Sequence, residues 1–313
     1  MKVKFWGVRG SIPTPLSSTQ LQSKVAAVVQ RIEPHDLETP ETREAFLANL
    51  PPYLLGTVGG NTTSIEVRLS DDSIIIFDGG SGIRELGISL KKQRERKSEY
   101  HIFFSHFHWD HLQGLPFFPP LSDPEAKIFF YSPVERFEEY VRGQMKFPYF
   151  PVTLDIMAAN LNFIVLKEPP YKIASARVYW RKMKHPGGCY SYQVREGDKR
   201  MIFSTDTELS ETDFERSEEN KAYFQDTDLL IMDSQYTLDE AIEKYDWGHS
   251  SFSLAVDFSA EWNLRNLVLF HHEPLYDDKK MFSILKSSGW YLNHLEQKGV
   301  KIYLAREGLE VDI

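Results

Sequence analysis

The sequence predicts an α/β fold in which β-sheets pack centrally and helices cover them, with a helical insertion near the N-terminus. Two strand patterns, at residues 63–69 and 73–77, are joined by a polar turn and predict a hairpin. Further along the chain, short apolar runs alternate with segments of helical spacing. Strands that come first as hairpins and then alternate with helices indicate sheets at the centre of the molecule and helices outside them.

The elements follow in order from this pattern. We expect strands at residues 2–8, 63–69, 73–77, 101–105, 127–131, 162–166, 176–182, 191–194, 201–204, 229–232 and 267–270. We expect helices at residues 82–92, 134–145 and 250–261. Residues 147–150, with three aromatic side chains and a proline, predict a loop or lid.

Residues 18–55 interrupt two strand regions with a helical pattern. Apolar residues recur there at helical spacing from Leu21 to Ile32, and Thr39 followed by Pro40 is typical of the start of a second helix. No internal repeat or low-complexity linker is visible. We therefore expect a single domain over residues 1–313 that carries a helical insertion at about 18–55.

Composition limits the location and partners of the protein. The single cysteine, Cys189, cannot form a disulfide within the chain, which fits a reducing compartment. The first 15 residues contain no apolar signal segment, and no apolar run approaches the length of a membrane span. We expect a cytoplasmic protein without a membrane contact. A formal net charge of −9 makes long nucleic acid a poor partner, and the basic residues at 91–97 fit a solvated helix end better than a binding patch.

Residues 105–111 carry the strongest chemical signal. His106, His108, Asp110 and His111 lie within six residues, directly after an apolar strand. A metal ion is the natural partner for such a group, because each buried polar group left unpaired costs about 1–3 kcal/mol. One loop could serve two adjacent metals, and imidazole with carboxylate suits zinc first, with manganese and iron as alternatives. A solvated histidine loop is the less favoured interpretation.

Four other candidate ligands also follow apolar strands. These are Asp78, His185, Asp206 and His271. Each residue alone is more typical of a turn, a cap or a hydrogen-bonded surface group. Their repeated position at strand ends instead predicts a shared metal site at one edge of the sheets.

The order of these residues along the chain resembles the five motifs of the metallo-β-lactamase fold superfamily. The resemblance implies a four-layer αββα sandwich with two divalent metal ions at one end of the paired sheets. It implies His106, His108 and His185 as ligands of the first metal, and Asp110, His111 and His271 as ligands of the second. Asp206 would bridge both metals, and Asp78 would orient the metal-binding loop.

A later segment resembles the ribonuclease Z and cyclic-phosphodiesterase branch of this superfamily. Asp233 ends a strand, and His249 begins a His-Ser-Ser sequence where the branch has a His-Ser-Thr-like motif after an acidic residue. The resemblance implies that Asp233 orients His249, which donates a proton or stabilises charge at the phosphoryl group. His249, Asp233 and Asp110 are the three candidate catalytic residues. The alternative for His249 is a neighbour of a helix N-terminus that is capped by Ser250.

The predicted function is metal-dependent hydrolysis of a small phosphodiester, such as a cyclic nucleotide or cyclic phosphate, by a hydroxide that bridges the metals. A ribonuclease acting on RNA 3′ ends is an alternative that a clustered basic face would favour. A lactonase or thioesterase is another, which a wide apolar pocket without phosphate-binding groups would favour. A sensory protein that keeps its metals and a redox role with iron also remain open.

Several residues near the predicted site stay ambiguous. His272 could support a ligand, contact substrate or be structural, whereas Arg9, Asn61 and Thr62 are more typical of ordinary turns. The insertion and residues 147–150 could form a lid or a homodimer contact. Aromatic side chains in such a lid could stack a base, although packing in the core is the favoured interpretation.

Overall fold

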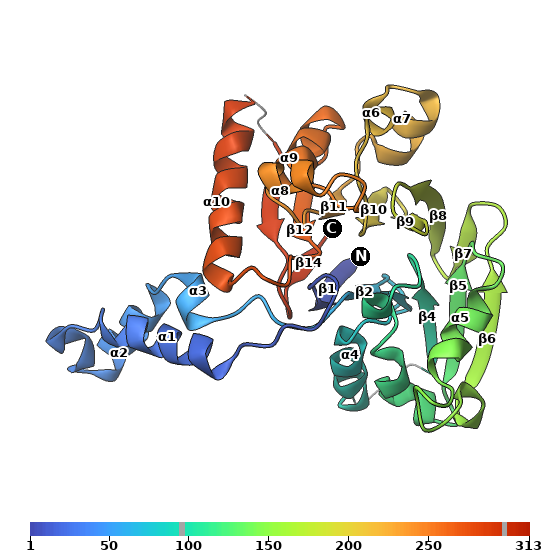
Figure 1. The fold of residues 1–313 in the computed structure, drawn as a ribbon, viewed down its shortest axis with the longest axis horizontal. Coiled ribbons are helices and arrows are strands. Elements are labelled where there is room, and N and C mark those ends of the chain that lie inside the picture. The colour runs from blue at the N-terminus through green and yellow to red at the C-terminus, as the bar shows by residue number, and fades with distance from the viewer. Residues whose placement is uncertain (94–97, 296–298) are drawn as a thin grey trace.

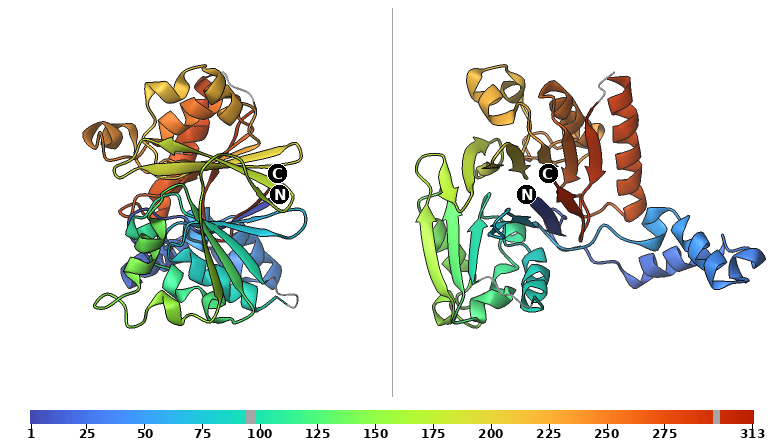
Figure 2. Two further views of the ribbon diagram at one scale, coloured as in Figure 1. Left: turned by 90° about the vertical axis from the view of Figure 1, so that its right-hand side faces the viewer. Right: turned by 180° about the vertical axis from the view of Figure 1, so that it is seen from behind.

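Two seven-stranded sheets face each other at the centre of the computed structural model, which describes residues 1–93, 98–295 and 299–313 (Figures 1 and 2). The first sheet has the order β14-β1-β2-β3-β4-β5-β6, and the second has the order β13-β12-β11-β10-β9-β8-β7. The strands of the first sheet are β1 (Lys2–Gly7), β2 (Ser64–Arg68), β3 (Ile74–Phe77), β4 (Glu99–Phe103), β5 (Lys127–Ser132), β6 (Asn160–Val165) and β14 (Glu310–Asp312). Those of the second are β7 (Tyr171–Ile173), β8 (Ala176–Met183), β9 (Cys189–Glu196), β10 (Lys199–Ser204), β11 (Leu229–Asp233), β12 (Asn266–Phe270) and β13 (Lys301–Leu304).

Both sheets are part antiparallel and part parallel. In the first, β14, β1, β2 and β3 pair antiparallel, and β3 to β6 pair parallel. In the second, β7 to β10 pair antiparallel, and β10 to β13 pair parallel. Because parallel neighbours end at the same edge, the loops after β3 and β4 and after β10, β11 and β12 gather there.

Helices cover the outer face of each sheet. Helices α4 (Gly82–Lys91) and α5 (Phe137–Gln144) lie on the first sheet, with short turns η2 (Trp109–His111), η3 (Leu115–Phe117), η4 (Pro119–Ser122) and η5 (Leu154–Ile156) nearby. The second sheet carries α6 (Glu211–Phe214), α7 (Glu218–Phe224), α8 (Leu238–Glu243), α9 (Phe252–Glu261) and α10 (Asp278–His294).

Three apolar clusters fill the three spaces between these four layers. The central cluster joins the inner faces of the two sheets, with Phe77, Phe103 and Phe203 fully buried. A second cluster lies under α9 and α10 and includes Trp262, and a third lies under α4 and α5 and includes Phe137. Burial of apolar surface on both faces of each sheet therefore holds the sandwich together.

The segment predicted as an insertion forms a helical arm that extends away from the sheets (Figure 1). It contains α1 (Ser18–Val29), η1 (Pro34–Leu37), α2 (Pro40–Ala48) and α3 (Pro52–Leu55). Thr39 caps α2 and Pro40 occupies its first turn, as predicted. An ion pair between Lys24 and Asp278 ties the arm to α10.

Some elements differ from those predicted. The strands β7, β13 and β14 and the helices α6, α7, α8 and α10 were not expected from the sequence pattern. The cap named in the alternative interpretation of His249 is wrong, because Ser251, not Ser250, accepts the hydrogen bond from the Leu254 amide. Of the predicted basic stretch 91–97, residues 94–97 lie outside the described residues. Among the described helices, none is both long and apolar enough to cross a membrane.

Candidate metal centre

The loops at one edge of the two sheets bring the predicted ligands together. Asp78 follows β3, the His106–His111 loop follows β4, and His185 follows β8. Asp206 follows β10 and His271 follows β12. Asp78, Asp206 and His271 have positive φ angles of 61°, 43° and 60°, which are uncommon for non-glycine residues. The chain therefore turns sharply directly after each strand, as is frequent at functional sites.

The ligand atoms form two adjacent groups. In one group, atoms of His106, His108, His185 and Asp206 all lie within 4.8 Å of one another. In the other, the same limit holds for Asp110, His111 and His271. The structure thus gathers all seven residues that the sequence predicts as ligands.

Asp206 lies between the two groups, and its two carboxylate oxygens face different imidazoles. Oδ2 lies 3.6 Å from His106 Nε2 and 3.7 Å from His185 Nε2. Oδ1 lies 3.1 Å from His111 Nε2 and 3.2 Å from His271 Nε2. This is the arrangement that a carboxylate shared by two cations requires.

Backbone and carboxylate groups orient the ligands from behind. Asp78 accepts hydrogen bonds from the amide and hydroxyl of Ser105, both at 2.7 Å, and lies 2.8 Å from His111 Nδ1. His185 Nδ1 lies 2.9 Å from the Gly248 carbonyl. Both histidines are therefore fixed with Nε2 directed at the centre.

The buried negative charges in the centre favour the binding of cations. Asp78, Asp110, Asp206 and Asp233 are buried, and no described lysine or arginine forms an ion pair with any of them. Nε2 of His106 and Nε2 of His111 are buried without a hydrogen-bond partner among the described residues. Buried charges and buried polar atoms are normally paired. The donor set therefore fits divalent metal ions.

The protonation states of the first group also suit metal binding. Burial lowers the pKa of His106, His108 and His185, so these rings are neutral at pH 7 and their lone pairs are available. Burial raises the pKa of Asp206, but the imidazoles of His271, His111 and His106 outweigh it and hold this pKa well below its usual range.

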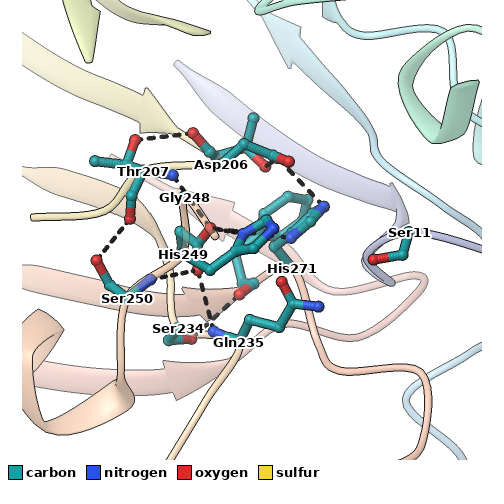
Figure 3. A network of polar contacts seen from close by, with 12 residues as sticks. Ser11, Asp206, Thr207, Ser234, Gln235, Gly248, His249, Ser250 and His271 are labelled. Carbon is teal, nitrogen blue, oxygen red and sulfur yellow. Dashed lines mark hydrogen bonds and ion pairs between the residues drawn. The ribbon is translucent and has the colours of Figure 1, made fainter. Parts of the chain in front are cut away.

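Asp233 and His249 form a pair beside the second group. His249 Nδ1 lies 2.7 Å from Asp233 Oδ2, and the amides of Thr207, Gln235 and Ser250 also donate to this carboxylate. The His249 ring stacks on His271 with centroids 5.1 Å apart (Figure 3). Burial lowers the pKa of His249, but Asp233 and the other carboxylates overcome this effect and raise it to about 9.

The ambiguous residues lie outside this centre and have structural contacts. His272 Nε2 lies 2.8 Å from the Ala305 carbonyl, and burial lowers its pKa to about 3. Arg9 donates to the carbonyls of Gly59, Glu273 and Tyr276. Asn61 and Thr62 bond to Glu307 and Ser81. These contacts favour the structural interpretation of all four residues.

Two contributors were not predicted from the sequence. The Ser11 amide donates to Asp110 Oδ2 at 2.8 Å, and the Gly248 carbonyl holds His185. Both act through backbone atoms, which carry no residue-type signal. The positive φ of Ser11 (57°) and Gly248 (89°) marks the turns that aim these groups.

Comparisons with known proteins agree with this fold. A family model described as β-lactamase superfamily domain matches residues 74–272. The chain is 22% identical to the ribonuclease Z of Prochlorococcus marinus (strain MIT 9301), over 83% of this chain and 98% of that one. The metallo-β-lactamase fold protein YhfI from Bacillus subtilis matches with a TM-score of 0.65 at 15% identity, covering 99% of this chain and 98% of that one. A diphosphatase from the PhnP family matches with a TM-score of 0.60 at 16% identity, covering 100% of this chain and 97% of that one.

The four layers, the two facing sheets and the match over residues 74–272 confirm the fold that the resemblance implied. The chain therefore belongs to the family described as β-lactamase superfamily domain, and it has the metallo-β-lactamase hydrolase fold.

Proposed function

We propose that this protein is a metal-dependent hydrolase that cleaves a small phosphodiester. The observation that carries the proposal is the position of Asp206, whose two oxygens face separate imidazole groups beside the His249–Asp233 pair. A shared carboxylate with a nearby oriented histidine suits phosphoryl chemistry, because charge must be stabilised on phosphoryl oxygens and a proton must reach the leaving oxygen.

The predicted ligands would hold two divalent ions. His106, His108 and His185 would bind one, Asp110, His111 and His271 the other, and Asp206 both. When bound, such ions lower the pKa of a water molecule and neutralise charge on phosphoryl oxygens. Zinc suits this imidazole-rich set, with manganese and iron as alternatives.

The chain's own residues supply orientation and a proton. Asp233 accepts the Nδ1 proton of His249, so the second ring nitrogen, Nε2, is available to the substrate. In the hydrolysis, the oxygen of water bonds to phosphorus, the ester P–O bond breaks, and His249 gives a proton to the leaving oxygen. The proton lost by the water returns to His249 through solvent.

The small size of the substrate is supported by charge. The net charge of −9 disfavours a polyanion. Among the described residues, the lining of the cavity that borders His106 and His108 contains no lysine or arginine, which also disfavours a polyanion but equally meets the criterion given above for a lactonase or thioesterase. The single, buried Cys189 is consistent with a cytoplasmic location, which we also propose.

A ribonuclease remains the second candidate, and one surface feature favours it. A hollow of about 500 Å³ is lined by Lys172, Arg177, Arg195 and Arg200, and none of its described lining residues is acidic. This basic hollow lies where β8 and β10 begin, at the end of the sheet opposite Asp206. The curated relative named above is a ribonuclease Z. A basic face away from the metals could hold the body of an RNA whose 3′ end reaches them.

Kinetics on two substrate classes separates these candidates. We expect turnover of nucleoside cyclic phosphates that is unchanged in a Lys172→Glu/Arg177→Glu variant, with little cleavage of RNA precursors extended at the 3′ end. Efficient RNA cleavage that the charge reversal weakens, but that a Lys279→Glu/Lys286→Glu control on α10 does not, would establish the ribonuclease instead.

A further inference from the structure

A cavity of about 810 Å³ adjoins the first ligand group. Its floor includes His106 and His108, and one wall is formed by residues 186–188, directly after His185. The remaining lining comes mainly from the metal-binding loop, the turn around η3, and α5 with the loop that follows it. A group attached to a phosphate at the metals would therefore extend into this cavity.

Aromatic side chains surround the cavity and remain exposed. Trp109 is 78% exposed and Tyr149 is 75% exposed, although large aromatic side chains usually gain stability from burial. Phe117 and Phe150, also in the lining, pack edge to face with centroids 5.8 Å apart. The favoured prediction of core packing for the aromatic side chains of residues 147–150 is wrong for Phe147 and Tyr149, which are both exposed, whereas Phe150 packs against the cluster under α4 and α5. Exposed aromatic faces beside a catalytic centre are suited to stacking a planar ligand.

One amide in the lining lacks a partner. Nε2 of Gln144, at the end of α5, is buried and forms no hydrogen bond within the described part of the chain. Leaving such a group unpaired is costly, and rotation of the Gln144 side chain toward the cavity would let a ligand atom satisfy it. A primary amide offers both a donor and an acceptor, which is the pattern that the edge of a nucleobase complements.

The charge of the lining further limits the class of ligand that fits the cavity. Among the residues that the structure describes, no aspartate, glutamate, lysine or arginine lines the cavity. A second cavity of about 580 Å³, on the side of His249, differs because Glu208 and Asp257 lie in its lining. A neutral planar group therefore fits the first cavity better than a charged group does.

We propose that the cavity lined by Trp109, Gln144 and Tyr149 binds the nucleobase of a nucleoside phosphodiester substrate. The base stacks on the exposed aromatic faces, and its polar edge bonds to the Gln144 amide. This inference rests on the proposed phosphodiesterase function and specifies the group that the substrate carries.

Two cyclic phosphates, one with a base and one without, test this proposal when kcat and KM are measured separately for each. Adenosine 2′,3′-cyclic phosphate carries a base, and glycerol cyclic phosphate does not. For Tyr149→Ala and Gln144→Leu we expect kcat/KM on the adenosine substrate to fall about 10-fold, mainly through KM, because the base loses a stacking partner in the first variant and a hydrogen-bond partner in the second. Activity on glycerol cyclic phosphate should be unchanged. Trp290→Ala, an exposed aromatic residue in the second cavity, is the matched control and should change neither.

Equilibrium binding separates failure of this inference from failure of the proposed function. Calorimetric titration of metal-free protein with adenosine needs neither metal nor turnover. Adenosine binding that Tyr149→Ala and Gln144→Leu weaken would support the inference even if no phosphodiester is cleaved. Hydrolysis of both cyclic phosphates with equal kcat/KM, or no adenosine binding by wild type, would overturn the inference and leave the phosphodiesterase proposal standing.

Discussion

Four buried carboxylates define the chemistry at the scale of single residues. Asp78, Asp110, Asp206 and Asp233 each lie within ion-pair distance of at least one imidazole, and His111 and His271 are each shared by more than one of these carboxylates. The acidic groups around His111 are strong enough to raise its pKa well above the ordinary value, against the opposing effect of burial. Positive charge is therefore required at this point, and divalent cations supply it more effectively than a proton on one ring.

His249 gives the sharpest prediction at this scale, because a proton donor matters only when the leaving group needs the proton. We expect His249→Ala to lower kcat about 100-fold or more on a nucleoside cyclic phosphate, whose alkoxide is a poor leaving group. On bis(p-nitrophenyl) phosphate, which releases a stable phenolate, the loss should be much smaller. Steady-state kinetics on both substrates, with metal content measured in parallel, checks this.

The Asp233→Asn variant is the matched control for this pair. It keeps the shape of the side chain but removes the charge that orients His249, so it should show the same substrate dependence with a smaller loss. Equal losses on both substrates in His249→Ala would contradict a proton-donating role.

At the scale of elements, strand ends and tight turns position the centre. Each predicted ligand that follows a strand is aimed by a loop of a few residues, and positive φ is adopted by two of these ligands, Asp206 and His271, and by the orienting residue Asp78. Gly248 shows how little space these turns leave for a side chain. It has a φ of 89°, and a Cβ atom there would lie 2.2 Å from His185 Nδ1.

Gly248→Ala should displace His185 and weaken metal binding. We expect a loss of affinity of about 10- to 100-fold, comparable to losing a group that orients a ligand. Competition with a chelator measures the affinity. Gly289→Ala in α10, where an added Cβ meets nothing within 4 Å, is the control and should bind metal as wild type does. Wild-type affinity in Gly248→Ala would show that His185 does not depend on this turn.

The sequence predicts the centre better than it predicts the elements. The gathering of these side chains is predictable because imidazole and carboxylate groups recur after apolar runs, whereas Ser11 and Gly248 act through backbone atoms that no side chain reveals. The strands β7, β13 and β14 have only three or four residues, too few for a period of two to stand out. Helix α10 does follow the helical spacing, since Met281, Ile284, Ser288 and Leu292 are buried. The polar Ser288 interrupts the apolar pattern that would predict the helix.

At the scale of the whole molecule, the two sheets form the stable body and the arm contributes nothing to the centre. None of the ligands comes from the arm, and its helices α1 and α2 have no buried residue. The aromatic cluster between the sheets is instead fully enclosed, and Phe77 and Phe203 stack there with centroids 5.1 Å apart.

Stability should therefore depend on the inter-sheet core and little on the arm. We expect Phe203→Ala to lower the free energy of unfolding by about 3–5 kcal/mol, because it leaves a cavity in a close-packed interior. Leu21→Ala, at a position on α1 that is 55% exposed, should change it by less than about 0.5 kcal/mol. Urea unfolding followed by circular dichroism measures both. Comparable losses would show that the arm packs on the body in solution.

The most direct test of the central claim is hydrolysis of bis(p-nitrophenyl) phosphate by purified protein that is stripped of metal and then reloaded with zinc or manganese. We predict that turnover is absent after stripping, returns with metal, and is lost in Asp206→Ala, because that carboxylate serves both ligand groups. Metal binding without turnover under any of these conditions, or full activity in Asp206→Ala, would contradict the two-metal phosphodiesterase.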